Sequence, residues 1–285
     1  MSAATQTEVT TATQGGRVRM AVSDSWVLTR RNLVTYLRKP DLLVFATIQP
    51  VLFVLLFVYV WGGAMDRILP PAVPYVDFLM PGIFIQTAIF AALQTGVGLA
   101  DDLQKGLIDR FRSLPMARSA VLTGRTAADT VVITFQVILM LIVAFLVGYR
   151  FHQGVAPALV ALVFAVAVGY AFTWVAAFAG LSLKTVEAVQ AATFTMVFPL
   201  VFASSAFVPD TDFPGWLQAW SNINPVSIWA DTLRVLTLGP LYSEAPKALV
   251  GNVPPLHTLL WQSAAWFFGL LAVFVPLGVR VYRRT

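Results

Sequence analysis

Six uncharged apolar segments dominate the pattern of hydrophobic and polar positions along the chain. They are Leu42–Gly63, Phe78–Ala100, Thr130–Gly148, Val155–Leu183, Ala188–Val208 and Leu256–Val279. A helix that rises about 1.5 Å per residue needs about 20 residues to cross about 30 Å of hydrocarbon, and each segment is about that long. The pattern therefore predicts an all-α polytopic membrane protein with six transmembrane helices in a membrane domain over residues 41–284.

The N-terminal forty residues divide into two parts. Residues 1–22 are rich in Thr, Ser, Gln, Ala and Gly and contain no aromatic residue, which predicts a disordered tail because so little surface can be buried. Residues 23–40 predict an amphipathic helix with Trp26 and Tyr36 on its apolar face and Arg31 opposite, although Arg30 interrupts the segregation. Such a basic helix is typical of a membrane surface, and a soluble linker is the alternative.

A charged stretch, DDLQKGLIDRFRSLPMARSAVLTGR, separates the second and third apolar segments. If the stretch is helical, one face carries four apolar residues: Leu103, Leu107, Phe111 and Leu114. Pro115 lacks an N–H and ends such a helix. We therefore expect a short amphipathic helix at residues 101–118 on which a second protein could act, and an ordinary charged loop is the alternative.

The connection before the last apolar segment, residues 209–240, is rich in Pro and Trp. Asn224-Pro225 predicts an N-cap followed by proline in the first helical turn, so two short helices are expected near Pro214–Ser221 and Pro225–Leu238. Their apolar residues are unsuited to a solvated loop: Trp216, Trp220, Trp229 and Leu233. The pattern predicts a re-entrant helical hairpin on the outer side, against the alternative of a loose loop.

The distribution of positive charge predicts the orientation. With the N-terminus inside and six spans, fifteen of the 19 Lys and Arg residues fall on one side and four on the other. The four on the outer side are Arg67, Arg150, Arg234 and Lys247. Since cytoplasmic loops carry the excess of Lys and Arg, both termini are predicted to be cytoplasmic.

Composition agrees with a membrane location and excludes several functions. The chain is 58% hydrophobic and 12% charged, with a mean hydropathy of +0.76, whereas soluble domains are about 25% charged. The net charge of +5 is therefore assigned to span-flanking residues, and no nucleic-acid partner is expected. The absence of cysteine excludes thiolate chemistry, and His152 and His257 lie too far apart in sequence to suggest a metal site. Residues 1–25 contain no apolar core of a signal peptide.

No enzymatic constellation is visible. Lys184-Thr185 lacks the glycines of a phosphate-binding loop, and no Ser/His/Asp set or carboxylate pair stands out. Asp129 heads the third span. Its two interpretations are a proton-carrying carboxylate and a structural residue at the membrane interface, and we favour the second.

Seven polar residues also lie within or beside the spans: Gln49, Gln86, Gln94, Gln136, Gln190, Thr193 and Thr195. Polar groups in hydrocarbon need partners, so these side chains should face other helices or a cavity. Two roles are open for them: hydrogen bonds between helices, or contact with a substrate.

The order of these features resembles the type-2 ATP-binding-cassette permeases, and especially the daunorubicin-resistance-type drug exporters of actinobacteria. The most specific pieces are GLIDRFRSLPMARSAVLTGR in the charged stretch and FVPDTDFPGWLQAWSNINPVSIWADTLR outside. The resemblance covers residues 23–284.

The resemblance implies a transport subunit without a nucleotide site of its own. It implies a separate cytoplasmic ATPase that holds ATP and Mg, a second permease copy or close relative, and a place in a bacterial inner membrane. Residues 101–118 become the coupling helix, with six expected contacts to the ATPase: Asp109, Arg110, Phe111, Arg112, Leu114 and Pro115. The substrate, a hydrophobic or amphipathic small molecule, would pass residues such as Gln86, Gln94, Phe194, Met196 and Phe198. The helix with Trp26, Arg30, Arg31 and Tyr36 would flank the coupling joint.

Two other functions stay open at this point. A proton-driven exporter would use an intramembrane carboxylate, for which Asp129 is the candidate. A lipid-modifying membrane enzyme would need clustered His, Asp or Glu at one membrane face.

Overall fold

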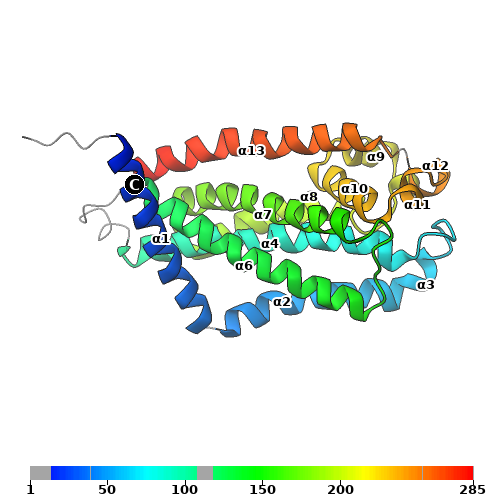
Figure 1. The fold of residues 1–285 in the computed structure, drawn as a ribbon, viewed down its shortest axis with the longest axis horizontal. Coiled ribbons are helices and arrows are strands. Elements are labelled where there is room, and N and C mark those ends of the chain that lie inside the picture. Colours follow the sequence, from blue (N-terminus) through cyan, green and yellow to red (C-terminus); the bar gives the residue numbers. More distant parts are fainter. Residues whose placement is uncertain (1–13, 39, 108–117, 252, 285) are drawn as a thin grey trace, which may run out of the picture.

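A computed structural model describes residues 14–38, 40–107, 118–251 and 253–284, and these form helices joined by short turns, without a strand. The longer elements are α1 (Gln14–Arg38), α2 (Pro40–Leu55), which continues into the short π-helical η1 (Leu56–Trp61), α4 (Tyr75–Gln104), α6 (Arg118–Leu146), α7 (Val155–Leu183), α8 (Val186–Phe202) and α13 (Leu256–Arg284). The shorter ones are α3 (Gly62–Met65), the 3₁₀ turn η2 (Asp210–Asp212), α9 (Gly215–Ile223), α10 (Pro225–Leu238), α11 (Pro240–Ser243) and α12 (Lys247–Val250). In Figure 1 the long helices run side by side as an elongated bundle.

Five helical stretches in the described residues are long and apolar enough to cross a membrane: Thr47–Met65, Tyr75–Gln104, Val121–Leu146, Val155–Leu183 and Leu256–Arg284. They correspond to five of the six predicted spans. The predicted span at 188–208 is shorter, because α8 has 17 residues and a length of about 25 Å at 1.5 Å per residue. An arrangement of six spans therefore stays a prediction.

The early end of α8 has a local cause. Pro199 lies in its last turns and provides no N–H for the helix. Asn224 then satisfies exposed carbonyls at this end, because its Nδ2 donates to Leu200 O at 2.8 Å and to Ala203 O at 3.1 Å. Its Oδ1 accepts from Val226 N at 2.9 Å, which confirms the predicted N-cap of α10. One side chain thus joins the end of α8 to the start of α10.

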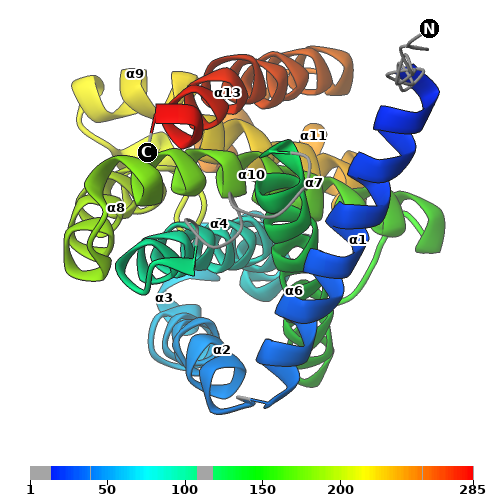
Figure 2. The same ribbon diagram turned by 90° about the vertical axis from the view of Figure 1, so that its left-hand side faces the viewer.

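Helix α4 lies near the centre of the bundle (Figure 2). Of its most apolar window, 83% of the residues are buried, against 6% for α13. It makes its largest contact with α7 and further contacts with α6, α8 and α10. Any site built on α4 is therefore fixed by several neighbouring helices.

Helix α1 crosses the end of the bundle at a steep angle to the long helices and packs against α6 (Figures 1 and 2). It begins at Gln14, so the prediction of a disordered tail through residue 22 is wrong for residues 14–22. Residues 17–22, RVRMAV, are compatible with a helix. The Thr-rich segment before them dominates the composition of residues 1–22 and so hides this. Residues 1–13 lie outside the described ranges.

The boundaries of the predicted coupling helix also differ. Residues 101–104 form the last turn of α4, and Arg118 is the first residue of α6. Gly106 adopts a left-handed backbone with φ of +64°, a conformation that glycine accommodates without steric cost and that interrupts the helix. A single helix over residues 101–118 is therefore incorrect at both ends.

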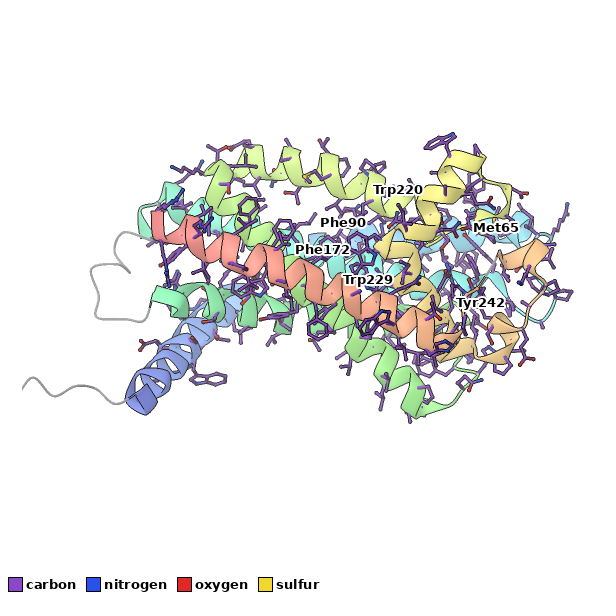
Figure 3. All side chains as sticks on the ribbon, turned by 90° about the horizontal axis from the view of Figure 1, so that it is seen from above. Met65, Phe90, Phe172, Trp220, Trp229 and Tyr242 are labelled. Carbon is purple, nitrogen blue, oxygen red and sulfur yellow. The ribbon has the colours of Figure 1, made fainter. Side chains whose placement is uncertain are left out.

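The two predicted helices of the 209–240 connection are α9 and α10. Trp229 and Leu233 are fully buried, and Trp229 lies edge-on to Phe172 at 6.0 Å between ring centroids (Figure 3). Trp216 and Trp220 on α9 are exposed by 74% and 40%. Helix α10 therefore belongs to the protein core, whereas α9 presents its tryptophans to the surroundings.

A buried arginine links α10 to the neighbouring parts of the bundle. The side chain of Arg234 on α10 is fully buried, and its guanidinium lies 3.6 Å from the centre of the Phe78 ring. It donates to four acceptors: Phe78 O at 2.9 Å, Asp231 Oδ1 at 2.8 Å, Ser205 O at 2.7 Å and Ala206 O at 2.9 Å. Tyr242 also donates to Asp231 Oδ1, at 2.8 Å. Arg234 thus joins α10 to α4 and to the segment after α8.

Candidate functional site

A pocket of about 340 Å³ lies between α2, α4, α6 and α8. It brings together all five glutamines that the sequence pattern singled out within or beside the spans: Gln49, Gln86, Gln94, Gln136 and Gln190. The other lining residues are Pro50, Thr87, Phe90, Ala91, Leu93, Val97, Thr193 and Phe194. None of these lining residues carries a charge, so the pocket combines carboxamides and hydroxyls with apolar and aromatic surface.

The pocket follows from the periodicity of α4. Gln86, Phe90 and Gln94 succeed one another at intervals of four residues, and Leu93 and Val97 fall on the same face. Phe90 lies in the interior of the bundle (Figure 3). This face lies in the middle of α4, and the three other helices each add one glutamine to it.

The depth of the polar groups differs across the pocket. Gln86 and Gln136 are exposed by only 2% and 3%, whereas Gln49, Gln94 and Gln190 are exposed. Gln86 Oε1 and Thr87 Oγ1 are buried and have no hydrogen-bond partner within the described part of the chain. Buried polar atoms normally have a partner, so a donor from a bound molecule would satisfy these two acceptors.

Of the residues expected along a substrate pathway, Gln86, Gln94 and Phe194 line this pocket. Met196 and Phe198 do not line it and are exposed by 73% and 40%. Phe198 instead continues an aromatic row, stacked on Phe194 at 5.1 Å and on Phe202 at 4.1 Å between ring centroids. The row extends from Phe202 to Phe207 and from there to Phe57 on η1, each at 5.1 Å.

The predicted interface-helix residues divide into two groups. Trp26 is exposed by 68%, and Arg30 and Arg31 are also exposed, and their contact with a membrane surface stays a prediction. Tyr36 instead faces the protein and donates to Asp129 Oδ1 at 2.9 Å. Burial and the nearby Asp129 raise the pKa of the Tyr36 hydroxyl, so it remains a donor at physiological pH.

Arg125 on α6 is the centre of a buried network that includes Asp129. Its Nε donates to Asp129 Oδ2 at 3.0 Å, and its Nη2 lies 3.3 Å from Tyr36 Oη. Its Nη1 lies 3.8 Å from Asp102 Oδ2 near the end of α4. Nη2 also reaches the main-chain oxygen of Gln94 at 3.5 Å. Asp129 therefore has the paired, structural arrangement that the sequence favoured, and the network joins α1, α4 and α6.

The six residues expected to contact an ATPase all fall within 108–117, outside the described residues: Asp109, Arg110, Phe111, Arg112, Leu114 and Pro115. The described flanks are the end of α4, where Asp101 pairs with Lys105 at 2.6 Å, and the start of α6. In the sequence, Asp102 of the Arg125 network precedes this segment by six residues, and Arg125 follows it by eight.

Sequence reasoning missed Arg125 and Arg234 as structural centres. Arg125 precedes Asp129 by four residues, a spacing at which helix side chains meet, and this signal was available from the sequence. Arg234 and Asp231 are three residues apart and provided a similar signal. The remaining partners of both arginines come from distant segments, several of them main-chain carbonyls, which no sequence pattern marks.

The chain matches the family model described as "ABC-2 type transporter" over residues 24–238. It is 30% identical over 276 residues to the daunorubicin resistance ABC transporter permease protein DrrB1 of Streptomyces coeruleorubidus, covering 96% of this chain and 92% of that protein. It is 26% identical over 274 residues to the probable doxorubicin resistance ABC transporter permease protein DrrC of Mycobacterium tuberculosis, covering 93% and 90%. It is also 26% identical over 216 residues to the putative transport permease ycf38 of Cyanophora paradoxa, covering 75% and 74%.

Proposed function

The chain belongs to the ABC-2 type transporter family, and from this premise we propose that it is the permease subunit of an ATP-driven exporter of hydrophobic or amphipathic small molecules. Its relatives are named as permeases of drug-resistance ABC transporters, and its apolar helices suit a multi-pass membrane protein. The proposal for this chain goes further, because it assigns a substrate class, a site and partners.

The observation that carries the proposal is the convergence of five glutamines on one pocket between α2, α4, α6 and α8. A carboxamide is both donor and acceptor, so the pocket can hydrogen-bond carbonyl, hydroxyl and amide groups without requiring a charge. Phe90 and Phe194 provide aromatic surface for an apolar framework. This chemistry suits a drug, an antibiotic or a lipid-like molecule that carries several hydrogen-bonding groups.

The proposed energy source lies in a partner chain. A cytoplasmic ATPase that holds ATP and Mg would contact residues 108–117, and a second copy of the permease or a close relative would complete the pathway. The proposed location is a bacterial inner membrane with both termini in the cytoplasm. ATP-driven closure of two ATPases would move the coupling segments, and the pocket would alternate between inward and outward access.

A proton-driven exporter is less well supported. It would need a carboxylate that is free to exchange protons along the pathway. Asp129 is hydrogen-bonded to Arg125 and Tyr36, and no carboxylate is among the residues that line the pocket.

ATP hydrolysis tests the proposed function directly. The purified chain alone should hydrolyse no ATP, and its complex with a cognate ATPase in proteoliposomes should be stimulated by a drug such as doxorubicin. Replacing Phe111 and Arg112 with alanine should abolish this stimulation, because both residues belong to the proposed ATPase contact. Transport that persists without ATP or any ATPase would contradict the proposal.

Ligand affinity tests the pocket. The Gln86→Met substitution preserves side-chain length but removes the buried carboxamide, and a lost hydrogen bond of about 1.4 kcal/mol weakens binding about tenfold. We therefore expect the Kd for doxorubicin, measured by equilibrium binding to the reconstituted protein, to increase by about tenfold.

The matched control for this substitution is Thr195→Val. Thr195 is exposed on α8, donates only to its own helix at Ala191 O, and does not line the pocket. Its replacement should leave the Kd unchanged. Equal affinities of the wild type and the Gln86→Met variant would show that the drug binds elsewhere.

A further inference from the structure

One guanidinium contacts α4 at two places, at the pocket wall and near the end of the helix that leads to the proposed coupling segment. Arg125 reaches the main-chain oxygen of Gln94, whose residue lines the pocket, and lies 3.8 Å from Asp102 two residues before α4 ends. Gln94, Gly98 and Asp102 follow one another at intervals of four residues on α4, so Gln94 and Asp102 belong to one row of side chains and lie about two turns apart. Arg125 therefore spans the last turns of α4 from the side of α6.

The packing at Gly98 shows how closely Arg125 lies against α4. A Cβ atom at Gly98 would be 1.9 Å from Arg125 Nη2 and 2.5 Å from Cζ. The guanidinium thus occupies the space of a side chain between Gln94 and Asp102, and a residue larger than glycine would displace it. This observation is independent of the ion pairs and identifies an uncharged position that controls the same contact.

The network offers Arg125 two carboxylate partners on different helices. Arg125 faces two carboxylates, with a hydrogen bond of 3.0 Å to Asp129 on its own helix and a looser approach of 3.8 Å to Asp102 on α4. The three side chains are only 3% to 18% exposed, so their attraction is weakly screened. A small shift of α4 relative to α6 would strengthen one contact and weaken the other, and Tyr36 would transmit the shift to α1.

We propose that Arg125 is a positioning residue that couples occupation of the glutamine-lined pocket to the segment between α4 and α6, by exchanging contact between Asp102 and Asp129. This inference rests on the proposed function. Movement of the pocket wall on α4 would alter the Arg125–Asp102 contact and so change the position of the coupling segment, and by linkage the reverse also holds.

Two variants test the proposal without removing Arg125. Asp102→Asn weakens the contact between the helices but retains the Asp129 pair, and Gly98→Ala displaces the guanidinium without changing a charge. Their matched controls are Asp101→Asn, whose carboxylate pairs with Lys105 instead, and Gly63→Ala, where an added Cβ meets nothing within 4 Å. The four variants and the wild type are reconstituted with the cognate ATPase. Three quantities are measured with doxorubicin as the probe: the Kd, the basal ATP hydrolysis rate and the ratio of drug-stimulated to basal hydrolysis.

We expect Asp102→Asn and Gly98→Ala to reduce the drug-dependent increase in hydrolysis by about tenfold, within the usual range of allosteric coupling, while the Kd stays at the wild-type value. The controls should behave as the wild type. A purely structural role would instead change the Kd, the basal rate and the amount of complex together, and that result would overturn the inference. Stimulation that is intact in both variants would also overturn it while leaving the proposed function in place. A wild-type complex that no drug stimulates would overturn the proposed function and this inference with it.

Discussion

Replacing Arg234 with methionine is expected to destabilise the folded protein by about 3–5 kcal/mol, the usual cost of breaking a buried ion pair by removing one partner. Methionine fills much of the same space but donates no hydrogen bond. Three main-chain oxygens, of Phe78, Ser205 and Ala206, would then lose the hydrogen bond from the guanidinium. Among the described side chains, Asp231 would keep the hydrogen bond from Tyr242. The measurement is the midpoint of thermal unfolding in detergent.

Asp231 determines how this destabilisation varies with pH. Burial raises the pKa of the Asp231 carboxyl, and Arg234 opposes the rise, so loss of Arg234 raises that pKa further. A carboxyl whose pKa is higher in the folded than in the unfolded state binds more protons when folded, and stability then falls as the pH increases. The deficit of the Arg234→Met variant should therefore be smaller at pH 5 than at pH 8. Adding Asp231→Asn should recover part of it at pH 8.

Arg67→Met is the matched control for the loss of charge. Arg67 is exposed in the turn before α4, and its replacement should change the unfolding midpoint little, since surface substitutions usually alter stability by less than about 0.5 kcal/mol. If Arg234→Met and Arg67→Met unfolded at the same temperature, the contacts of Arg234 would contribute no net stability.

The contrast between these two arginines indicates what sequence reasoning reaches. Both were counted as outer-side charges, because the distribution of charge along a chain depends on residue type alone. The burial of Arg234 depends on where α4 and the segment after α8 place their carbonyl groups. Main-chain acceptors have no sequence signature, so the sequence does not distinguish a buried arginine from an exposed one.

The long helices were predictable because a continuous apolar run is specified by composition over about twenty residues. The end of α8 was not, because it depends on Asn224 satisfying carbonyls more than twenty residues earlier in the chain. The N-cap role of the same asparagine was predictable, since it acts two residues away. Local hydrogen bonds can thus be inferred from the sequence, whereas tertiary ones require the fold.

The pocket illustrates the same limit. Each glutamine could be identified as a polar group in an apolar run, with a neighbouring helix or a cavity as its expected partner. The rotation of α2, α4, α6 and α8 about their axes decides that the five converge, and no single helix specifies that rotation. Met196 and Phe198 were predicted to line the pathway because they share a helix with Phe194. The rotation of α8 places Phe194 at the pocket but not the other two.

The second large effect is expected at Gly180, where α7 meets α4. A Cβ atom added there would be 2.3 Å from Gly96 O and 2.9 Å from Gly96 C, and a Cβ at Gly96 would be 2.4 Å from Ala176 O. Ala176 and Gly180 are small residues four positions apart on α7, a common but weak signal of close helix packing. Here the two backbones touch, so even alanine at residue 180 forces the helices apart. We expect Gly180→Ala to cost about 3 kcal/mol, at the upper end of usual overpacking penalties.

Gly269→Ala on α13 should instead stabilise the folded protein. An added Cβ meets nothing within 4 Å there, and alanine is favoured over glycine in a helix interior by up to about 1 kcal/mol. Thermal unfolding of the two variants therefore compares the same glycine-to-alanine change where it meets a neighbouring backbone and where it meets open space.

Because α4 carries most of the pocket wall, its displacement in Gly180→Ala should also weaken doxorubicin binding, whereas Gly269→Ala should bind as the wild type. If Gly180→Ala were as stable as Gly269→Ala, the backbone contact between α4 and α7 would be absent, and the position of the pocket wall would need another explanation.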